Sequence, residues 1–229
     1  MELRINAIRL VAIVLAAGFA GCRSVPRATA TGGAEPTSVD ESDRAAIARA
    51  RADSARLPYT AADIHFMIGM IGHHAQAIKM AGWAASHGGS PSIQTLAQRI
   101  INAQQDEIVT MQNWLRDRRQ PVPEPDPAGV KMNMGGMEHV MLMPGMLTPE
   151  QMNQLDAARG TKFDRLFLAF MIQHHRGAVQ MVKDLFATPG AGQDELTFKL
   201  ASDINVDQTT EIARMERMLA ILTIQGHAP

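Results

Sequence analysis

The sequence has little cysteine, few aromatic residues and no excess of charge of either sign. Its 229 residues include one Cys, one Tyr and two Trp. A single cysteine excludes a disulfide within the chain. The 22 basic and 23 acidic residues nearly cancel and no Lys/Arg cluster stands out, so a nucleic-acid partner is not indicated. With 46% hydrophobic residues, we expect one folded domain with tails.

Long hydrophobic runs are also scarce. The run from Leu10 to Ala20 is too short to span a membrane as a mature helix, and residues 1–22 are predicted to be an export signal. It ends at Phe19-Ala-Gly-Cys22, which resembles a bacterial lipobox and implies lipid attachment at Cys22. We expect a periplasmic lipoprotein, with plain secretion or an uncleaved anchor as alternatives because Phe19 is unusual there.

Residues 23–57 are predicted to be a flexible tether. They are rich in Ala, Thr, Ser, Gly and Pro and show no apolar period. Within them, Ser42 to Leu57 could form a short helix. The folded domain is expected to span residues 58–226.

Methionine, with 16 residues, is abundant, and one stretch occurs twice, from Asp63 to Met80 and from Asp164 to Met181. Both copies follow the pattern D-x-x-F-x-x-x-M-I-x-H-H-x-x-A-x-x-M. Each is followed by A-x-x-I-x-x-x-Q-x-x-E-I-x-x-M-x-x-x-L, which begins at Ala97 in the first half and at Ala201 in the second. The protein is therefore two tandem copies of a paired segment.

Helical periodicity predicts an all-α, four-helix bundle made of two antiparallel hairpins, 61–117 and 161–225. Each hairpin opens with a predicted capping box, in which Thr60 pairs with Asp63 and Thr161 with Asp164. The remaining histidines His65, His87 and His227 are interpreted as surface or tail residues.

A linker, residues 120–148, joins the two hairpins. Six Met and His139 lie between Lys131 and Met146, and we interpret this part as a flexible connector. Pro149 then opens a short helix that ends at Gly160. The linker is long enough to cross from one end of the bundle to the other, as in ferritin-like proteins, but an end loop is equally compatible with it.

The apolar stripe of each repeated helix carries polar groups into the predicted core. Met70 and His74, and likewise Met171 and His175, share one helical face at i, i+4. The partner helices bring Gln104 and Glu107, and Gln208 and Glu211, to the same interior zone. Burying a carboxylate costs several kcal/mol unless it is paired, so a bound cation would explain this pattern in both halves.

The first histidine of each pair cannot share that stripe, because adjacent helical residues point about 100° apart. His73 and His174 are therefore predicted at its edge, above Met80 and Met181 at i+7. A second His/Met site between neighbouring helices could form there.

Imidazole binds several transition metals, whereas thioether sulfur favours Cu(I). The predicted metal ligands are His73, His74, His174, His175, Met70, Met171, Met80, Met181, Glu107 and Glu211. Copper is the expected metal, for sequestration or for handover to a delivery partner. No nucleophile or phosphate loop stands out, so we do not expect an enzyme. Two alternatives stay open, a ferritin-like di-metal oxidoreductase and a metal-free interaction module.

The doubled D-x-x-F-x-x-x-M-I-x-H-H motif, the Q-x-x-E-I-x-x-M segments and Met143-Pro-Gly-Met-Leu-Thr-Pro-Glu-Gln-Met152 resemble the bacterial domain-of-unknown-function family numbered three hundred and five. The resemblance covers about Tyr59 to Leu222. It implies export and a ferritin-like four-helix bundle. Because the family includes a periplasmic copper-binding protein, it also implies copper binding through the four paired histidines and nearby Met.

Overall fold

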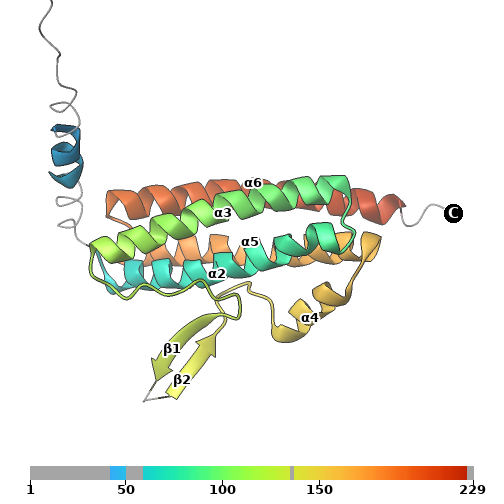
Figure 1. Ribbon diagram of the computed structural model, residues 1–229, viewed down its shortest axis with the longest axis horizontal. Helices are drawn as coiled ribbons and strands as arrows, with labels where there is room; N and C mark the ends of the chain where they lie inside the picture. The colour runs from blue at the N-terminus through green and yellow to red at the C-terminus, as the bar shows by residue number, and fades with distance from the viewer. Residues whose placement is uncertain (1–41, 50–58, 135–136, 226–229) are drawn as a thin grey trace, which may run out of the picture. The chain divides into compact units, whose positions relative to one another are not determined.

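The computed structural model describes residues 42–49, 59–134 and 137–225, and the protein is predominantly helical (Figure 1). Residues 42–49 form a short helix. The long helices are α2 (Ala61–Ser86), α3 (Pro91–Asp117), α5 (Gly160–Ala187) and α6 (Glu195–Gln225). The predicted signal peptide, the lipobox-like segment, His227 and most of the predicted tether lie outside the described residues. Among the residues that are described, no helix has both the length and the apolar character needed to cross a membrane.

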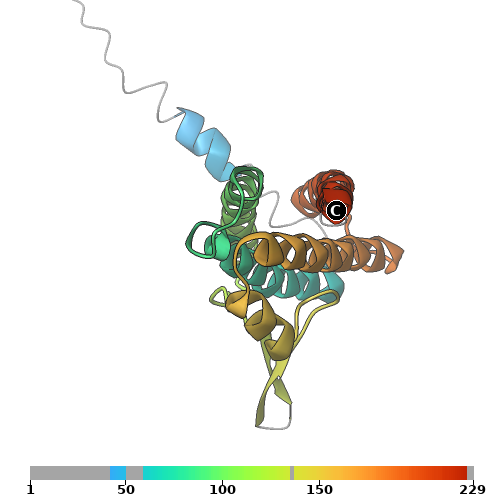
Figure 2. The ribbon, with the colours of Figure 1, turned by 90° about the vertical axis from the view of Figure 1, so that its right-hand side faces the viewer.

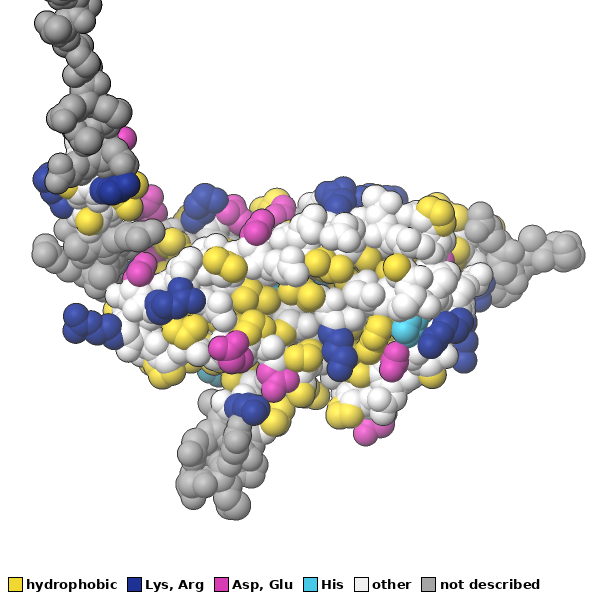
Figure 3. All heavy atoms as spheres, in the orientation of Figure 1, with side chains coloured by type: hydrophobic (Ala, Val, Ile, Leu, Met, Phe, Trp, Pro, Cys, Tyr) yellow, Lys and Arg dark blue, Asp and Glu magenta, His cyan; other side chains and the backbone are white. Residues whose placement is uncertain are grey.

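The long helices form the two predicted hairpins, α2 with α3 and α5 with α6. The hairpins pack together through α2 and α5, while α3 and α6 lie apart from each other above them (Figure 2). On the face shown in Figure 3, basic and acidic side chains are interspersed, in agreement with a net charge of −1.

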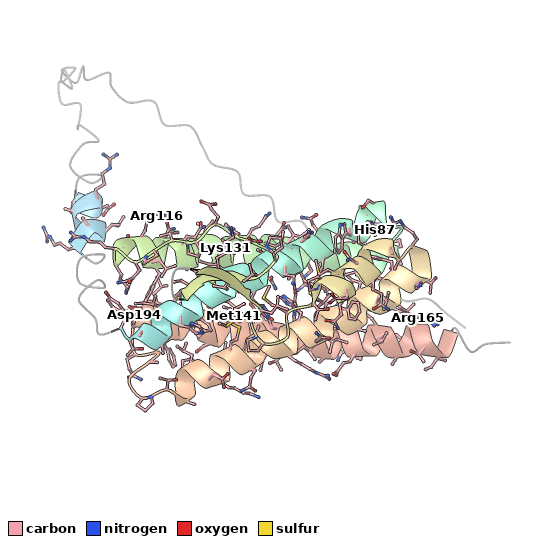
Figure 4. All side chains as sticks on the ribbon, turned by 90° about the horizontal axis from the view of Figure 1, so that it is seen from below. His87, Arg116, Lys131, Met141, Arg165 and Asp194 are labelled. Atoms are coloured by element: carbon pink, nitrogen blue, oxygen red, sulfur yellow. The ribbon has the colours of Figure 1, made fainter. Side chains whose placement is uncertain are left out.

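The connection between the hairpins is a crossover, so the end loop is excluded. Near its start, Gln120 Nε2 donates to Tyr59 Oη at 3.3 Å, beside the beginning of α2. At its end, the Gly160 N–H donates to the His87 carbonyl at 2.9 Å, beside the end of α2. Figure 4 shows Asp194 and His87 at opposite ends of the long helices, which is the length that the linker crosses.

The linker is more ordered than the sequence suggested. It contains an antiparallel hairpin of β1 (Val130–Met134) and β2 (Met137–Met141), in which Val130 pairs with Met141. The short helix α4 (Pro149–Ala157) follows and begins at the predicted position, with a capping box between Thr148 and Gln151. The interpretation of this segment as a wholly flexible connector was wrong.

The two repeated aspartates fasten each hairpin to the turn of the other. Asp63 closes the predicted capping box with Thr60, and its Oδ1 also accepts from the Gly192 N–H at 2.7 Å. The box predicted for Asp164 is wrong, because α5 begins one residue earlier and has no side-chain cap. Asp164 instead accepts from the Ser90 N–H at 3.1 Å.

Replacing Asp164 with alanine should lower the free energy of unfolding by about 2 kcal/mol, because a partly buried N–H loses its acceptor. Urea denaturation would measure the loss. The control is Asp184→Ala, which removes an exposed carboxylate from the same helix and should change stability by less than about 0.5 kcal/mol. Equal losses in the two variants would contradict the fastening role.

The core consists of two apolar clusters. The first is built from residues 66–71 of α2, 108–115 of α3, 178–185 of α5 and 200–204 of α6. The second is built from residues 77–84, 93–100, 163–172 and 212–222 of the same helices. Every long helix therefore leaves a gap between its contributions to the two clusters, and the repeated polar residues occupy that gap.

Candidate metal centre

The first histidine of each pair lies at the contact between the two hairpins. His73 comes from α2 and His174 from α5, and their ring centroids are 3.8 Å apart with an interplanar angle of 41°. Neither residue is exposed to solvent. The sequence placed both residues at the edge of the stripe, between neighbouring helices; α2 packs on α5 along this line, so the two imidazoles face each other and are buried.

The second histidine of each pair points toward the partner helix of its own hairpin. His74 Nε2 lies 2.6 Å from Glu107 Oε2, and His175 Nε2 lies 2.7 Å from Glu211 Oε2. Both imidazoles are fully buried, whereas the glutamate side chains are 17% and 19% exposed. Because adjacent helical residues point about 100° apart, one His–His pair serves two different interfaces. We call the four imidazoles the histidine layer.

The carboxamides of the repeat lie in the same zone. Gln104 and Gln208 are each 3% exposed. A count of residues from the turn of each hairpin had predicted these glutamines level with the second histidines, but the glutamates one turn further along bond the imidazoles instead. This difference follows from the exact height at which the helices of a hairpin meet, which a count from the turn does not fix.

A loop of the linker, residues 143–147, lies against the histidine layer, and we call it the strap. The Pro144 carbonyl accepts from His73 Nε2 at 3.0 Å. The strap is also held by Gln76, whose Oε1 accepts from the Leu147 N–H at 2.6 Å and whose Nε2 donates to the Leu147 carbonyl at 3.1 Å. Gly177 of α5 allows the closest approach, because a Cβ there would lie 1.9 Å from the Pro144 oxygen.

Sequence reasoning missed these strap contacts, although the repeat contains a signal for them. Gln76 and Gly177 occupy equivalent positions in the two copies, and so do Gly72 and Gln173. At each equivalent position, one copy has a glycine and the other a glutamine. Gly72 allows approach of the linker near Val130, and Gln173 donates to the Gly145 carbonyl at 3.4 Å. Pairs of Gly and Gln thus mark where the linker meets the two otherwise similar helices.

Burial keeps the central imidazoles neutral. Desolvation, followed by the nearby His74, lowers the pKa of His73 from 6.5 to about 3. Desolvation, followed by His73, lowers the pKa of His174 well below its ordinary value. Neutral imidazole is the form that binds metal ions.

The four methionines predicted as ligands are buried, but they do not share one zone. Met70 and Met181 lie in the first apolar cluster, and Met80 and Met171 lie in the second. Because α2 and α5 are antiparallel, residues that precede the histidines in α2 lie level with residues that follow them in α5. The thioethers therefore flank the histidine layer on both sides. Sequence reasoning had placed Met70 and Met171 together.

Two other sequence predictions concern single histidines. His65 is exposed, as predicted. His87 is not a surface residue: it is 5% exposed, its Nε2 lies 2.8 Å from Asp156 Oδ1, and its ring centroid lies 5.3 Å from that of Phe163.

Within the described part of the chain, no group of three or more His, Cys, Asp or Glu side chains is arranged to hold a metal ion.

The sequence profile of a family described as "Domain of unknown function (DUF305)" matches residues 63–219, which include the histidine layer and the strap. The chain belongs to the DUF305 family. A DUF305 crystal structure from Streptomyces coelicolor, of a protein named as secreted, is 30% identical with a TM-score of 0.59; the match covers 71% of this chain and 94% of the other.

A second DUF305-like structure is CopM in its Cu(I)-bound form. It is 29% identical, with a TM-score of 0.51, and the match covers 70% of this chain and 96% of CopM. CopM has also been solved in Cu(II)-bound and silver-bound forms. A protein of Acanthamoeba polyphaga mimivirus is 40% identical over 57 residues, which is 25% of this chain and only 38% of the viral protein.

Proposed function

We propose that this DUF305 protein binds copper as Cu(I) at the histidine layer, for sequestration or handover after export. One observation carries the proposal. The Nδ1 atoms of His73, His74, His174 and His175 are all buried and have no hydrogen-bond partner among the described residues. Buried polar atoms are normally paired, and four equivalent exceptions in one layer call for a ligand.

Hydrogen bonds on three of the four other ring nitrogens favour the same conclusion, while His174 Nε2 also has no partner among the described residues. A carbonyl oxygen only accepts, so His73 carries its proton on Nε2 and presents a lone pair at Nδ1. The carboxylates of Glu107 and Glu211 accept from Nε2 of their histidines in the same way. Carboxylates in this position orient imidazole ligands and raise their basicity. Glu107 and Glu211 are thus proposed to hold the ligands rather than to bind the metal directly.

The surrounding sulfur atoms favour copper over harder metals. Thioethers are soft ligands that suit Cu(I), and Met70, Met181, Met80 and Met171 supply them from both sides of the layer. The likeness to CopM, which has been solved with Cu(I), Cu(II) and silver, supports a soft-metal site. In the described residues, His, Cys, Asp and Glu side chains alone form no group of three or more that could hold a metal ion, so the proposed coordination includes thioether sulfur.

The remaining parts of the proposal concern class and location. We propose a ferritin-like arrangement of the four long helices, without enzymatic activity. Export is supported by the secreted relative from Streptomyces coelicolor. Anchoring through a lipid on Cys22, with a periplasmic location, is proposed from the lipobox-like sequence.

Anaerobic titration with Cu(I) against a competing chelator tests the function. Replacing His73 and His174 together with alanine should weaken Cu(I) binding by about 100-fold, because the two central imidazoles are lost. The matched control is His65→Ala, which removes an exposed histidine from α2 and should leave the affinity within twofold of wild type.

Circular dichroism establishes that the double variant is folded. Undiminished affinity in a folded double variant would overturn the histidine-layer site. An iron-loaded protein with the absorption spectrum of an oxo-bridged metal pair would instead favour the di-metal oxidoreductase.

A further inference from the structure

A second polar site lies on the opposite side of the second histidines from the strap. Between α3 and α6 is a groove of about 160 Å³. Its polar lining consists of Arg99, Gln104, Glu107, Asp207, Gln208, Thr210 and Glu211. No sulfur atom lines it, which distinguishes it from the copper site proposed above.

The groove contains buried polar atoms that no described part of the chain satisfies. Gln104 and Gln208 line it and are each 97% buried, given their exposure of 3%. Within the described residues, Gln104 Oε1 and both polar atoms of the Gln208 side chain have no hydrogen-bond partner. An unpaired buried polar group typically costs about 1–3 kcal/mol. A ligand with its own hydrogen-bonding shell would remove that cost in both halves of the repeat.

The groove is also acidic. It gathers the carboxyl groups of Glu107, Asp207 and Glu211, with Arg99 as its one basic lining residue. Burial, followed by repulsion from Glu107 and Glu211, raises the pKa of Asp207, and Arg99 offsets this only in part. Three carboxyl groups that line one groove, with the exposed Asp207 at its surface, attract a cation.

We propose that this groove binds a hydrated divalent cation of the hard class, such as Mg²⁺, Ca²⁺ or Mn²⁺. Oxygen ligands select such ions. At about 30 Å³ per water, the groove has room for an ion with several of its waters. Binding through retained water agrees with the lack, in the described residues, of side chains arranged to hold a bare ion.

Asp207 is the residue that belongs to this site alone. Glu107 and Glu211 also hold imidazoles of the histidine layer, whereas Asp207 is not among the proposed copper ligands or their partners. The inference therefore goes beyond the copper function and does not depend on it. It gives Glu107 and Glu211 a second role, because both residues also line the groove.

The test uses Mn²⁺ as the probe, with the free ion measured by electron paramagnetic resonance on metal-free protein. We expect one Mn²⁺ per chain and about a tenfold loss of affinity in Asp207→Asn, equivalent to about 1.4 kcal/mol. The control is Asp203→Asn, which removes an equal charge one turn earlier on α6, where Asp203 is 50% exposed and paired with Lys199. Its affinity should stay within threefold of wild type.

The outcomes separate the two proposals. No Mn²⁺ binding by wild type, or equal losses in Asp207→Asn and Asp203→Asn, would overturn the groove site. Cu(I) affinity should be unchanged in Asp207→Asn. If wild type binds Mn²⁺ with the expected dependence on Asp207 but fails to bind Cu(I), the copper function is wrong and the groove site stands.

Discussion

Replacing Gly177 with alanine should destabilise the protein by about 4 kcal/mol, more than most single substitutions do. The added Cβ would lie 1.9 Å from the Pro144 oxygen and 2.6 Å from Gly145 Cα. These are backbone atoms and cannot rotate aside, so the strap must leave α5. Its departure would break the bond between His73 and the Pro144 carbonyl and expose Met143, Met146 and Leu147, which are each no more than 5% exposed.

The control for Gly177→Ala is Gly82→Ala on α2. No atom lies within 4 Å of a Cβ built at Gly82, so alanine there should stabilise the protein by about 0.5–1 kcal/mol through helix propensity. Both changes are read from urea denaturation at neutral pH. If Gly177→Ala were as stable as wild type, the strap would not be seated against α5.

Lowering the pH from 7 to 4.5 should destabilise the metal-free protein by about 3 kcal/mol or more. Unfolded histidine binds a proton near pH 6.5, whereas the folded pKa is about 3 for His73 and well below the ordinary value for His174. The unfolded state thus binds more protons, and stability falls as the pH drops below 6.5. At pH 4.5 His73 is two pH units below its unfolded pKa, which is worth about 3 kcal/mol, and the lowered pKa of His174 adds a loss of the same sign.

The double variant His73→Gln with His174→Gln isolates this effect. It removes both buried imidazoles, so its stability should fall far less between pH 7 and 4.5, by less than about half the wild-type loss. His65→Gln, which changes an exposed histidine, should keep the wild-type profile. The measurement is urea denaturation at each pH with a chelator present. An unchanged acid loss in the double variant would show that other groups cause it.

Most of the helical architecture could be predicted because it depends on local patterns. The apolar period, the turn residues and the repeat placed the two helical hairpins within one residue of their observed outer ends. The repeat also predicted that both hairpins bring the same polar residues inward. Burial of His74, His175, Gln104 and Gln208 follows directly from these patterns.

What failed depends on contacts between distant segments. His73 was placed at a stripe edge. The packing of α2 on α5, together with the strap that lies against both helices, buries it completely. A helical wheel does not show which neighbour covers an edge. Asp164 matched a capping box in sequence, yet the turn at Ser90 offered its carboxylate a different donor. Sequence patterns also did not distinguish ordered strands in the Met-rich linker from a flexible chain.

The polar layer between two apolar clusters also determines how the helices align along their axes. Sliding α5 against α2 by one turn, about 5.4 Å, would move His174 away from His73 and into aliphatic surroundings. The same slip within a hairpin would separate an imidazole from its carboxylate and leave each buried without a partner. A one-turn slip therefore breaks more than one buried contact and costs free energy at each of them. The histidines therefore fix the register of these helices without the help of a metal ion.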